Sequence, residues 1–513
     1  MAVGPLIGID IGSQQIKIAE LRPTKNGMAI TGLGIGPTPL GVIQNSIITD
    51  PGVMGAAIKQ IMRESGISVK RAVGCISGQN AVVVRIIEVP RMTDSELKET
   101  MKWEVERHVP FAPSETVLDY QPLQIGSPDS ANSPNMEVLL AVAQQDAVNN
   151  YLDTLFAAGL DPVAIDIEPL AIARAVLDIV DGRAVVRPLL PPGMEIPIEE
   201  YPETVAVVHI GAANTDIGIY RSDELSFPRS LPLAGDSLTR AIAEALQYTL
   251  EQAERVKRDN AVVQLDRMAV YTGTGTYDGS GDDMPQFTDE DNFNLTEDAD
   301  NPFDLNAAEG DPGFRTTHSG RLTTPSGRLG DPQFDDAERT QPMDRRVLNL
   351  AGGRPLAPDA SSVFLPPGDG GFGLPLGGVD EEKLRDDIFE AIAPVLGELA
   401  SELRRSLDYY RSRGAQVSVD RVLLTGGSAN LTNLAAFLQN ELQIPVAVAN
   451  PLASLPVTSK LFDPGYLPAI GPAFTVAVGL AARDVVFAAN PAPKVSKKAA
   501  AAANLSAAAP PAD

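Results

Sequence analysis

The stretch 6–21 constrains most strongly what this chain can fold into, because it contains a strand, a tight turn and a second strand. Its first strand is apolar except for Asp10, and Gly12 with Ser13 provides the turn, since glycine tolerates backbone conformations that other residues resist. The Asp10 carboxylate can supply a hard oxygen to Mg²⁺, and the N–H groups of the turn can face phosphate oxygens. A plain hairpin with a solvent-facing aspartate accounts for the same residues, so this hairpin alone is a weak signal.

The same design occurs again in the second half of the chain. Residues 205–210 and 215–220 have the pattern of strands, and 211–214 is a turn of small residues. One such hairpin in each half predicts two related domains that clasp one nucleotide. The pair is far more specific than either hairpin alone.

Charge and cysteine content exclude several classes of protein. The net charge of −26 argues against general nucleic-acid binding and against electrostatic attachment to anionic lipid. A single cysteine, Cys75, cannot form an intramolecular disulfide and fits a reducing compartment. The three histidines have no metal-ligand spacing, and no secretory signal or membrane-spanning run is evident. If the protein works at a membrane, we therefore expect a partner to hold it there.

Composition and periodicity divide the chain into an α/β protein with two main domains. The predicted first domain comprises 1–85 and 161–200, a small α/β subdomain is inserted at 86–160, and the predicted second domain comprises 204–272 and 379–489. Within the first domain, the glycine- and proline-rich segment 32–39 is expected to be a loop.

Two further segments lack periodicity. Residues 273–378 are rich in Gly, Pro, Asp and Asn, and we expect this acidic insertion to be largely disordered. Residues 490–513 form an Ala/Pro/Lys tail with the same expectation.

Two helices carry recognisable signals. Thr93 and Glu96 form a capping box at the start of the subdomain helix. A long helix is predicted from Gly235 to Val256, with apolar residues on one face. At its end, Glu254 and Lys257 lie three residues apart and therefore together, either as an ordinary surface ion pair or as a clamp on a sugar hydroxyl or a base edge.

A third candidate site follows the buried strand 421–424. Gly426 and Gly427 have no side chains to exclude a base or a phosphate, and they precede the predicted helix 431–442, whose free N–H groups favour anions. The segment 474–481 is a helix of small residues that suits close packing at a hinge between two domains.

These features, in this order, resemble the actin/hexokinase/heat-shock ATPase superfamily and its actin-like (ribonuclease H-like) fold. Within that superfamily, the chain is similar to the PilM family of type IV pilus assembly. The residues that carry the resemblance are 8–13 with Lys17, 89–111, 166–168, 405–410 and 424–429. The inserted subdomain resembles the one that PilM shares with the division protein FtsA.

The resemblance implies ATP and Mg²⁺ as ligands, with Asp10 and the neighbourhood of Asp216 flanking the metal and Glu168 helping to orient the attacking water. The other residues implied to bind the nucleotide are Gly12, Ser13 and Lys17 in the first hairpin, Gly211, Ala212, Asn214 and Thr215 in the second, Glu254 and Lys257 at the ribose or adenine, and Gly426, Gly427 and Ser428 in the adenosine pocket.

The chain departs from this pattern in two places. His209 begins the second hairpin where many relatives carry an aspartate, which removes one carboxylate from the metal side and argues against rapid hydrolysis. The acidic insertion 273–378 is also outside the usual pattern, and it is either a gate on partner access or a passive tether.

The resemblance implies a cytoplasmic ATP-binding scaffold of pilus assembly and twitching motility, peripheral to the inner membrane through its partner. That partner would be the N-terminal tail of a PilN-like membrane protein, held in a groove beside the 86–160 subdomain. ATP would act mainly as a ligand that closes the domains, with slow hydrolysis at most. The alternatives are an FtsA-like division protein and a free-standing cycling ATPase. FtsA-type proteins carry a C-terminal amphipathic membrane helix, which the tail at 490–513 does not resemble. The sequence leaves open whether the chain forms homo-oligomers.

Overall fold

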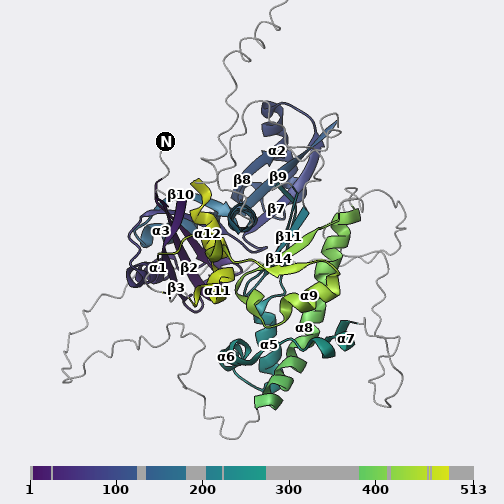
Figure 1. The fold of residues 1–513 in the computed structure, drawn as a ribbon. Helices are drawn as coiled ribbons and strands as arrows, with labels where there is room; N and C mark the ends of the chain where they lie inside the picture. The colour runs from purple at the N-terminus through teal and green to yellow at the C-terminus, as the bar shows by residue number, and fades with distance from the viewer. Residues whose placement is uncertain are drawn as a thin grey trace, which may run out of the picture. The chain divides into compact units, whose positions relative to one another are not determined.

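The computed structural model describes most of both predicted main domains (Figure 1). The described residues are 4–24, 27–123, 134–180, 204–221, 224–272, 381–412, 418–458, 462 and 465–484. The predicted insertion 273–378 and the predicted tail 490–513 lie outside them.

The first sheet has the strand order β10-β6-β1-β2-β3. Its strands are β1 (Leu6–Ile11), β2 (Gln15–Thr24), β3 (Gly27–Pro37), β6 (Arg71–Ile76) and β10 (Asp161–Ile167). β1 runs antiparallel to β2 and parallel to β6, and this register places Asp10 opposite Lys17. The predicted first hairpin is therefore present, at the centre of the sheet.

The second sheet repeats this topology with the order β13-β12-β11-β14-β15. Its strands are β11 (Thr204–Ile210), β12 (Thr215–Arg221), β13 (Glu224–Leu231), β14 (Arg421–Thr425) and β15 (Val446–Val448). β11 runs antiparallel to β12 and parallel to β14, and His209 lies opposite Asp216. The repeat of two antiparallel and two parallel pairings confirms that the two hairpins belong to related units.

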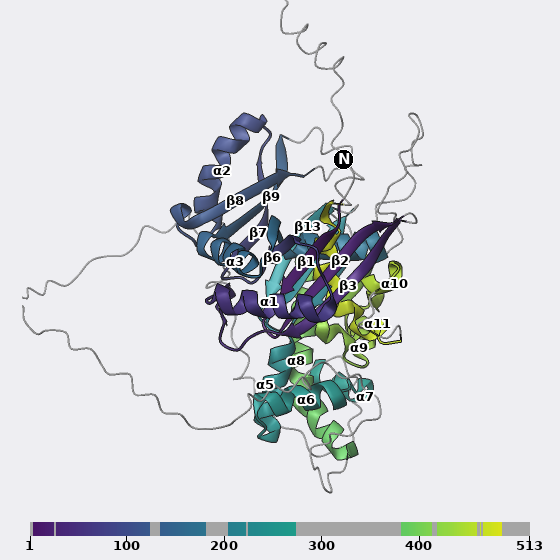
Figure 2. The ribbon, with the colours of Figure 1, turned by 90° about the vertical axis from the view of Figure 1, so that its left-hand side faces the viewer.

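The loop prediction for 32–39 is wrong, because most of that segment belongs to β3. Its alternating glycines let α1 (Pro51–Ser65) approach the sheet closely: a Cβ atom on Gly34 would lie 2.8 Å from Cγ2 of Ile61, and one on Gly36 would lie 2.7 Å from its Cγ1. Helix α3 (Gln145–Ala157) packs beside α1 on the same core (Figure 2).

Two short helices pack together beside both sheets. They are α4 (Glu168–Ala173), which continues as a π-helical turn over Arg174–Val180, and α12 (Thr475–Ala481). A Cβ atom on Gly479 would lie 1.8 Å from the carbonyl oxygen of Ala171, so only glycine permits this contact. The small-residue helix predicted near 474–481 is confirmed.

A three-stranded sheet has the order β7-β9-β8 and forms its own small core with α2. Its elements are β7 (Val82–Pro90), α2 (Asp94–His108), β8 (Thr116–Pro122) and β9 (Asn135–Gln144). The predicted capping box is present: the Thr93 N–H donates to the Glu96 carboxylate at 2.9 Å.

Helices share one hydrophobic core with the second sheet (Figures 1 and 2). They are α5 (Gly235–Leu246), α6 (Leu250–Asn260), α7 (Leu265–Thr272), α8 (Glu381–Tyr410) and α9 (Leu434–Leu442). The single long helix predicted from Gly235 to Val256 is wrong. Gln247 takes the left-handed conformation and ends α5, and Thr249 with Gln252 forms a capping box that starts α6.

Short elements connect these layers. They are β4 (Ile43–Gln44), β5 (Ile47–Ile48), α10 (Pro451–Ser454), α11 (Leu467–Ile470) and 3-10 turns over Pro113–Glu115, Gly427–Asn430 and Gly471–Phe474. Within the part of the chain that the structure describes, every helix is too short or too polar to cross a membrane.

Candidate functional site

The two hairpin turns have the same internal geometry. The Gly12 N–H donates to the carbonyl of Gln15 at 3.0 Å, and the Gly211 N–H donates to the carbonyl of Asn214 at 3.0 Å. Ser13 lies exposed at the first tip, and Ala212 and Asn214 are half-buried in the second. Both turns thus expose small residues at the ends of equivalent strands.

The first hairpin places a buried ion pair directly behind its turn. The Lys17 ammonium lies 2.8 Å from the Asp10 carboxylate, and both side chains are largely buried. The turn is fixed from the side by Thr38, whose hydroxyl donates to the carbonyl of Gly12 at 2.7 Å and whose N–H donates to the carbonyl of Gln14 at 2.9 Å. One cation and one carboxylate, paired with each other, therefore lie directly behind the first turn.

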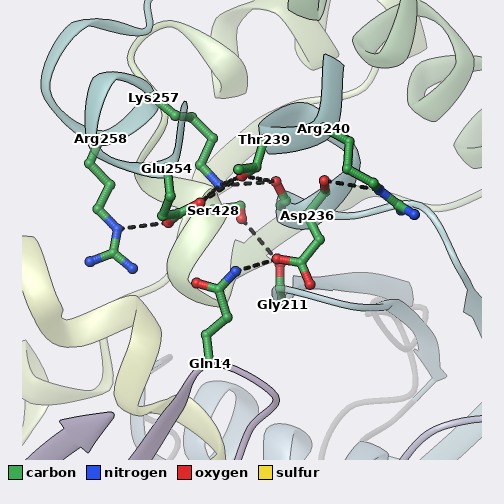
Figure 3. A network of polar contacts seen from close by, with 10 residues as sticks. Gln14, Gly211, Asp236, Thr239, Arg240, Glu254, Lys257, Arg258 and Ser428 are labelled. Carbon is green, nitrogen blue, oxygen red and sulfur yellow. Dashed lines mark hydrogen bonds and ion pairs between the residues drawn. The ribbon is translucent and has the colours of Figure 1, made fainter. Parts of the chain in front are cut away.

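The second hairpin is attached to the start of α5 (Figure 3). The N–H groups of Gly235 and Asp236 donate to the carbonyls of Gly211 and Ala212 at 3.1 and 2.8 Å, and the Ser428 hydroxyl also donates to the Gly211 carbonyl, at 3.1 Å. This arrangement brings the predicted residues Gly211, Ala212 and Ser428 together. The predicted residue Thr215 is buried instead, and its hydroxyl donates to the Leu233 carbonyl at 2.6 Å.

Glu254 and Lys257 form a bracket between α5 and α6 rather than an ordinary surface pair (Figure 3). The Lys257 ammonium lies 2.6 Å from the Glu254 carboxylate, and it donates to the Gly235 carbonyl at 2.9 Å and to the Thr239 hydroxyl at 2.7 Å. An ammonium has three N–H donors, so these partners occupy all of them. Burial is the largest single effect on Glu254 and raises its pKa. The ion pair with Lys257 and the hydrogen bonds that Glu254 accepts together outweigh burial, so the pKa of Glu254 is lowered.

The Gly426–Gly427 turn allows two backbone segments to lie close together. Gly426 has a φ of +89°, and a Cβ atom there would lie 2.3 Å from the carbonyl oxygen of Ile210 at the end of β11. A Cβ atom on Gly427 would have no neighbouring atom within 4 Å. The first glycine lets β14 approach the second hairpin, and the second leaves room beside Ser428.

Glu168 and His209 meet between the two sheets. The His209 Nε2 atom lies 3.3 Å from the Glu168 carboxylate, and its Nδ1 atom lies 2.8 Å from the Thr425 hydroxyl. Burial lowers the pKa of His209 to about 4, so this imidazole is neutral at pH 7. Burial, with the nearby Asp216 and Asp10 carboxylates, raises the pKa of Glu168 well above its usual range.

The residues near Asp10 fit magnesium only as part of a metal–nucleotide complex. Within the described ranges, no group of three or more His, Cys, Asp and Glu side chains has the geometry to hold a metal ion. Mg²⁺ is usually bound through one or two carboxylates together with substrate phosphates, so Asp10 fits as its protein ligand. Burial raises the pKa of Asp216 to about 6, so this carboxyl takes up a proton at a higher pH than a free aspartate does.

Three polar residues in this region were not among the predicted site residues. They are Gln14, Thr38 and Asp236, and the Gln14 side-chain amide donates to the Asp236 carboxylate. Burial raises the pKa of Asp236. Asp236 had a sequence signal only as part of a helix cap, and nothing in the sequence indicates that Gln14 faces it.

Comparisons with known proteins agree on the family to which this chain is similar. A family model described as type IV pilus assembly protein PilM matches residues 8–267 and 381–485. The solved structure of a PilM-PilN type IV pilus biogenesis complex is 26% identical, with a TM-score of 0.59 over 94% of this chain and 98% of that chain.

Cell division proteins are more distant relatives. FtsA of Bacillus subtilis (strain 168) is 24% identical over 271 residues, which are 49% of this chain and 57% of that protein. FtsA of Streptococcus pneumoniae serotype 2 (strain D39 / NCTC 7466) is 23% identical over 273 residues, 50% of this chain and 55% of that protein. The chain thus spans little more than half the length of these curated relatives.

Proposed function

Since the chain belongs to the type IV pilus assembly protein PilM family, we propose that it is a nucleotide-binding scaffold of a pilus assembly complex. Its α/β fold is actin-like, with the duplicated sheet described above. The observation that carries the proposal is the likeness, over nearly its whole length, to a chain solved in a PilM-PilN complex. Its partner is then the N-terminal cytoplasmic tail of a PilN-like membrane protein, which holds it at the inner membrane.

The proposed partner interaction is tested by titrating the purified chain with a peptide of a PilN-type N-terminal tail. A saturable complex with one peptide per chain is expected, and a scrambled peptide of the same composition serves as the control. Equal binding of both peptides, or of neither, contradicts the proposal. An FtsA-like division role is the alternative that would then gain support, since half of the chain also matches FtsA.

We further propose that Mg-ATP binds between the two hairpins. The Asp10 carboxylate would hold the metal, and the Lys17 ammonium would neutralise phosphate charge. The turns at Gly12 and Gly211 would supply backbone N–H groups, and the bracket of Glu254 and Lys257 would face the sugar or base. When bound, Mg²⁺ would neutralise charge on the phosphate oxygens.

A cycling ATPase is the second candidate, because Glu168 is buried beside His209 of the second hairpin and within electrostatic reach of Asp10 in the first. Burial raises the pKa of Glu168, and the neighbouring His209 supplies no second carboxylate for the metal, so we expect slow turnover. Steady-state phosphate release that disappears in Glu168→Gln would support the cycling ATPase. Release that is absent from the unmodified protein would contradict it.

A further inference from the structure

One buried arginine, Arg174, lies outside the site described above. It begins the π-helical turn that continues α4, and only 7% of the residue is exposed. A guanidinium group stays charged at any ordinary pH, and such a group is almost never buried without partners. The partners of Arg174 therefore indicate what this side chain holds in place.

Arg174 joins the end of strand β10 to helix α12. Its Nη2 group donates to the Asp166 carboxylate, and its Nη1 group donates to the carbonyl oxygen of Gly479 at 2.8 Å. Arg483 is a second cation near Asp166, with its Nε atom 3.6 Å from the carboxylate, but its side chain is 31% exposed. The planar guanidinium of Arg174 thus binds two acceptors on different elements, in a fixed geometry that the ammonium group of lysine lacks.

The Asp166 carboxylate fixes the beginning of α4 as well. Its other oxygen accepts the N–H of Ile167 at 2.8 Å, and Ile167 is the residue directly before the helix. Glu168 is the first residue of α4. It is therefore connected to Arg174 twice, through the backbone of the helix and through Asp166.

The first turn of α4 also meets the second sheet. The Glu168 carboxylate lies 3.3 Å from the Nε2 atom of His209 on β11. The Tyr220 hydroxyl on β12 donates to the Pro169 carbonyl at 2.8 Å. Glu168 also accepts a hydrogen bond from the Ser77 hydroxyl, which follows β6 of the first sheet. Because these contacts share one helical turn, a small rotation of α4 would change the distance between Glu168 and His209.

We propose that Arg174 is a positioning residue, which holds Glu168 beside His209 by fixing α4 to Asp166 and to α12. The inference rests on the proposed nucleotide site, in which Glu168 helps to orient the attacking water. It adds the residue that sets the position of that carboxylate. Arg174 acts through α4 and not by contact with the nucleotide.

The imidazole of His209 reports on this position, because the chain contains only three histidines. Proton–nitrogen NMR of histidine-labelled protein separates their ring signals, and His209→Gln assigns the signal of His209. Arg174→Lys keeps the positive charge beside Asp166 but loses the fork that also binds Gly479. We expect Arg174→Lys to move the His209 signal and to leave the other two in place. The matched control is Arg483→Lys, which should leave all three signals in place.

A second variant separates the positioning role from loss of folding. Removing one partner of a buried ion pair is strongly destabilising, whereas removing both charges together is often tolerated. Asp166→Asn combined with Arg174→Gln is therefore expected to unfold cooperatively, as a folded protein does. It should still move the His209 signal, because the shorter side chain cannot bridge both acceptors.

Single-turnover phosphate release from Mg-ATP measures the effect on the proposed site. A misplaced catalytic group slows chemistry more than it weakens binding. We therefore expect Arg174→Lys to lower the rate constant of release roughly tenfold and to leave the dissociation constant of a fluorescent ATP analogue near its unmodified value.

Three results would overturn the positioning role. The first is a His209 signal that stays in place in Arg174→Lys and in the folded double variant. The second is an equal shift in Arg483→Lys, because any change near Asp166 would then have the same effect. The third is an unchanged rate constant of phosphate release in Arg174→Lys. Failure of the proposed nucleotide function looks different: no form of the protein binds the analogue, while the His209 signal still responds to Arg174→Lys.

Discussion

At the scale of single residues, Gly426 is a position where both the backbone conformation and the available space require glycine. Its φ of +89° is strained for any other residue, and an added Cβ would meet the Ile210 carbonyl oxygen at 2.3 Å. We expect Gly426→Ala to lower the free energy of unfolding by about 2–4 kcal/mol, from backbone strain and the displaced strand end. Urea denaturation measures it, and Gly427→Ala, which faces open space, is the control expected to change stability little.

The stability of the folded protein depends on pH through His209. The folded protein holds its pKa near 4, against 6.5 for a free imidazole, so between these values the unfolded chain binds more protons. The contribution of His209 to stability is thus complete above pH 6.5 and is lost as the pH falls to 4. Asp216 acts in the opposite direction, because its pKa is raised from 3.8 to about 6 and the folded state binds more protons there.

A single variant separates these two effects. His209→Gln removes the imidazole titration, so the stability of the unmodified protein relative to His209→Gln should fall by on the order of 3 kcal/mol between pH 7 and pH 4. Urea denaturation of both proteins at several pH values measures this difference. A difference that stays constant with pH would show that His209 titrates normally in the fold.

At the scale of elements, the contact of α4 with α12 depends on Gly479. A Cβ atom there would lie 1.8 Å from the Ala171 carbonyl oxygen, and backbone on both sides leaves no flexible side chain to move away. We expect Gly479→Ala to destabilise the protein by about 1–3 kcal/mol through overpacking. Gly52→Ala is the matched control, because its Cβ would meet only Asp50 at an ordinary 3.4 Å in the first turn of α1. Equal melting temperatures for the two variants would contradict this close contact between α4 and α12.

The elements also show what local sequence can predict. The hairpin around Gly12 and the capping box at Thr93 were predictable, because their signals lie within a few residues. Strand β3 was not, because its glycines serve the approach of α1, a tertiary contact that local propensity reads as a loop. The break between α5 and α6 did have a local signal, the capping box of Thr249 and Gln252, which apolar periodicity on either side concealed.

At the scale of the whole molecule, the sequence predicted the pairing of two hairpins but not the contacts between them. Gln14 and Asp236 are 222 residues apart, and only the folding of both domains brings them together. The same holds for Glu168 and His209, whose chemical environment depends on burial between the sheets. The family resemblance implied most of the candidate site residues, whose roles stay predictions, whereas the contacts between the two domains required coordinates.

We propose that nucleotide and partner bind to one scaffold and that closure of its domains couples the two binding events. The most direct test is a calorimetric titration with the PilN-type peptide, with and without Mg-ATP, for the unmodified chain and Asp10→Ala. Asp153→Ala, which removes an exposed carboxylate of α3, is the control. We expect Mg-ATP to change the peptide affinity of the unmodified chain and the control at least roughly fivefold, a typical coupling between sites, and to leave Asp10→Ala unchanged. Peptide affinity that is the same in all these conditions would contradict the account.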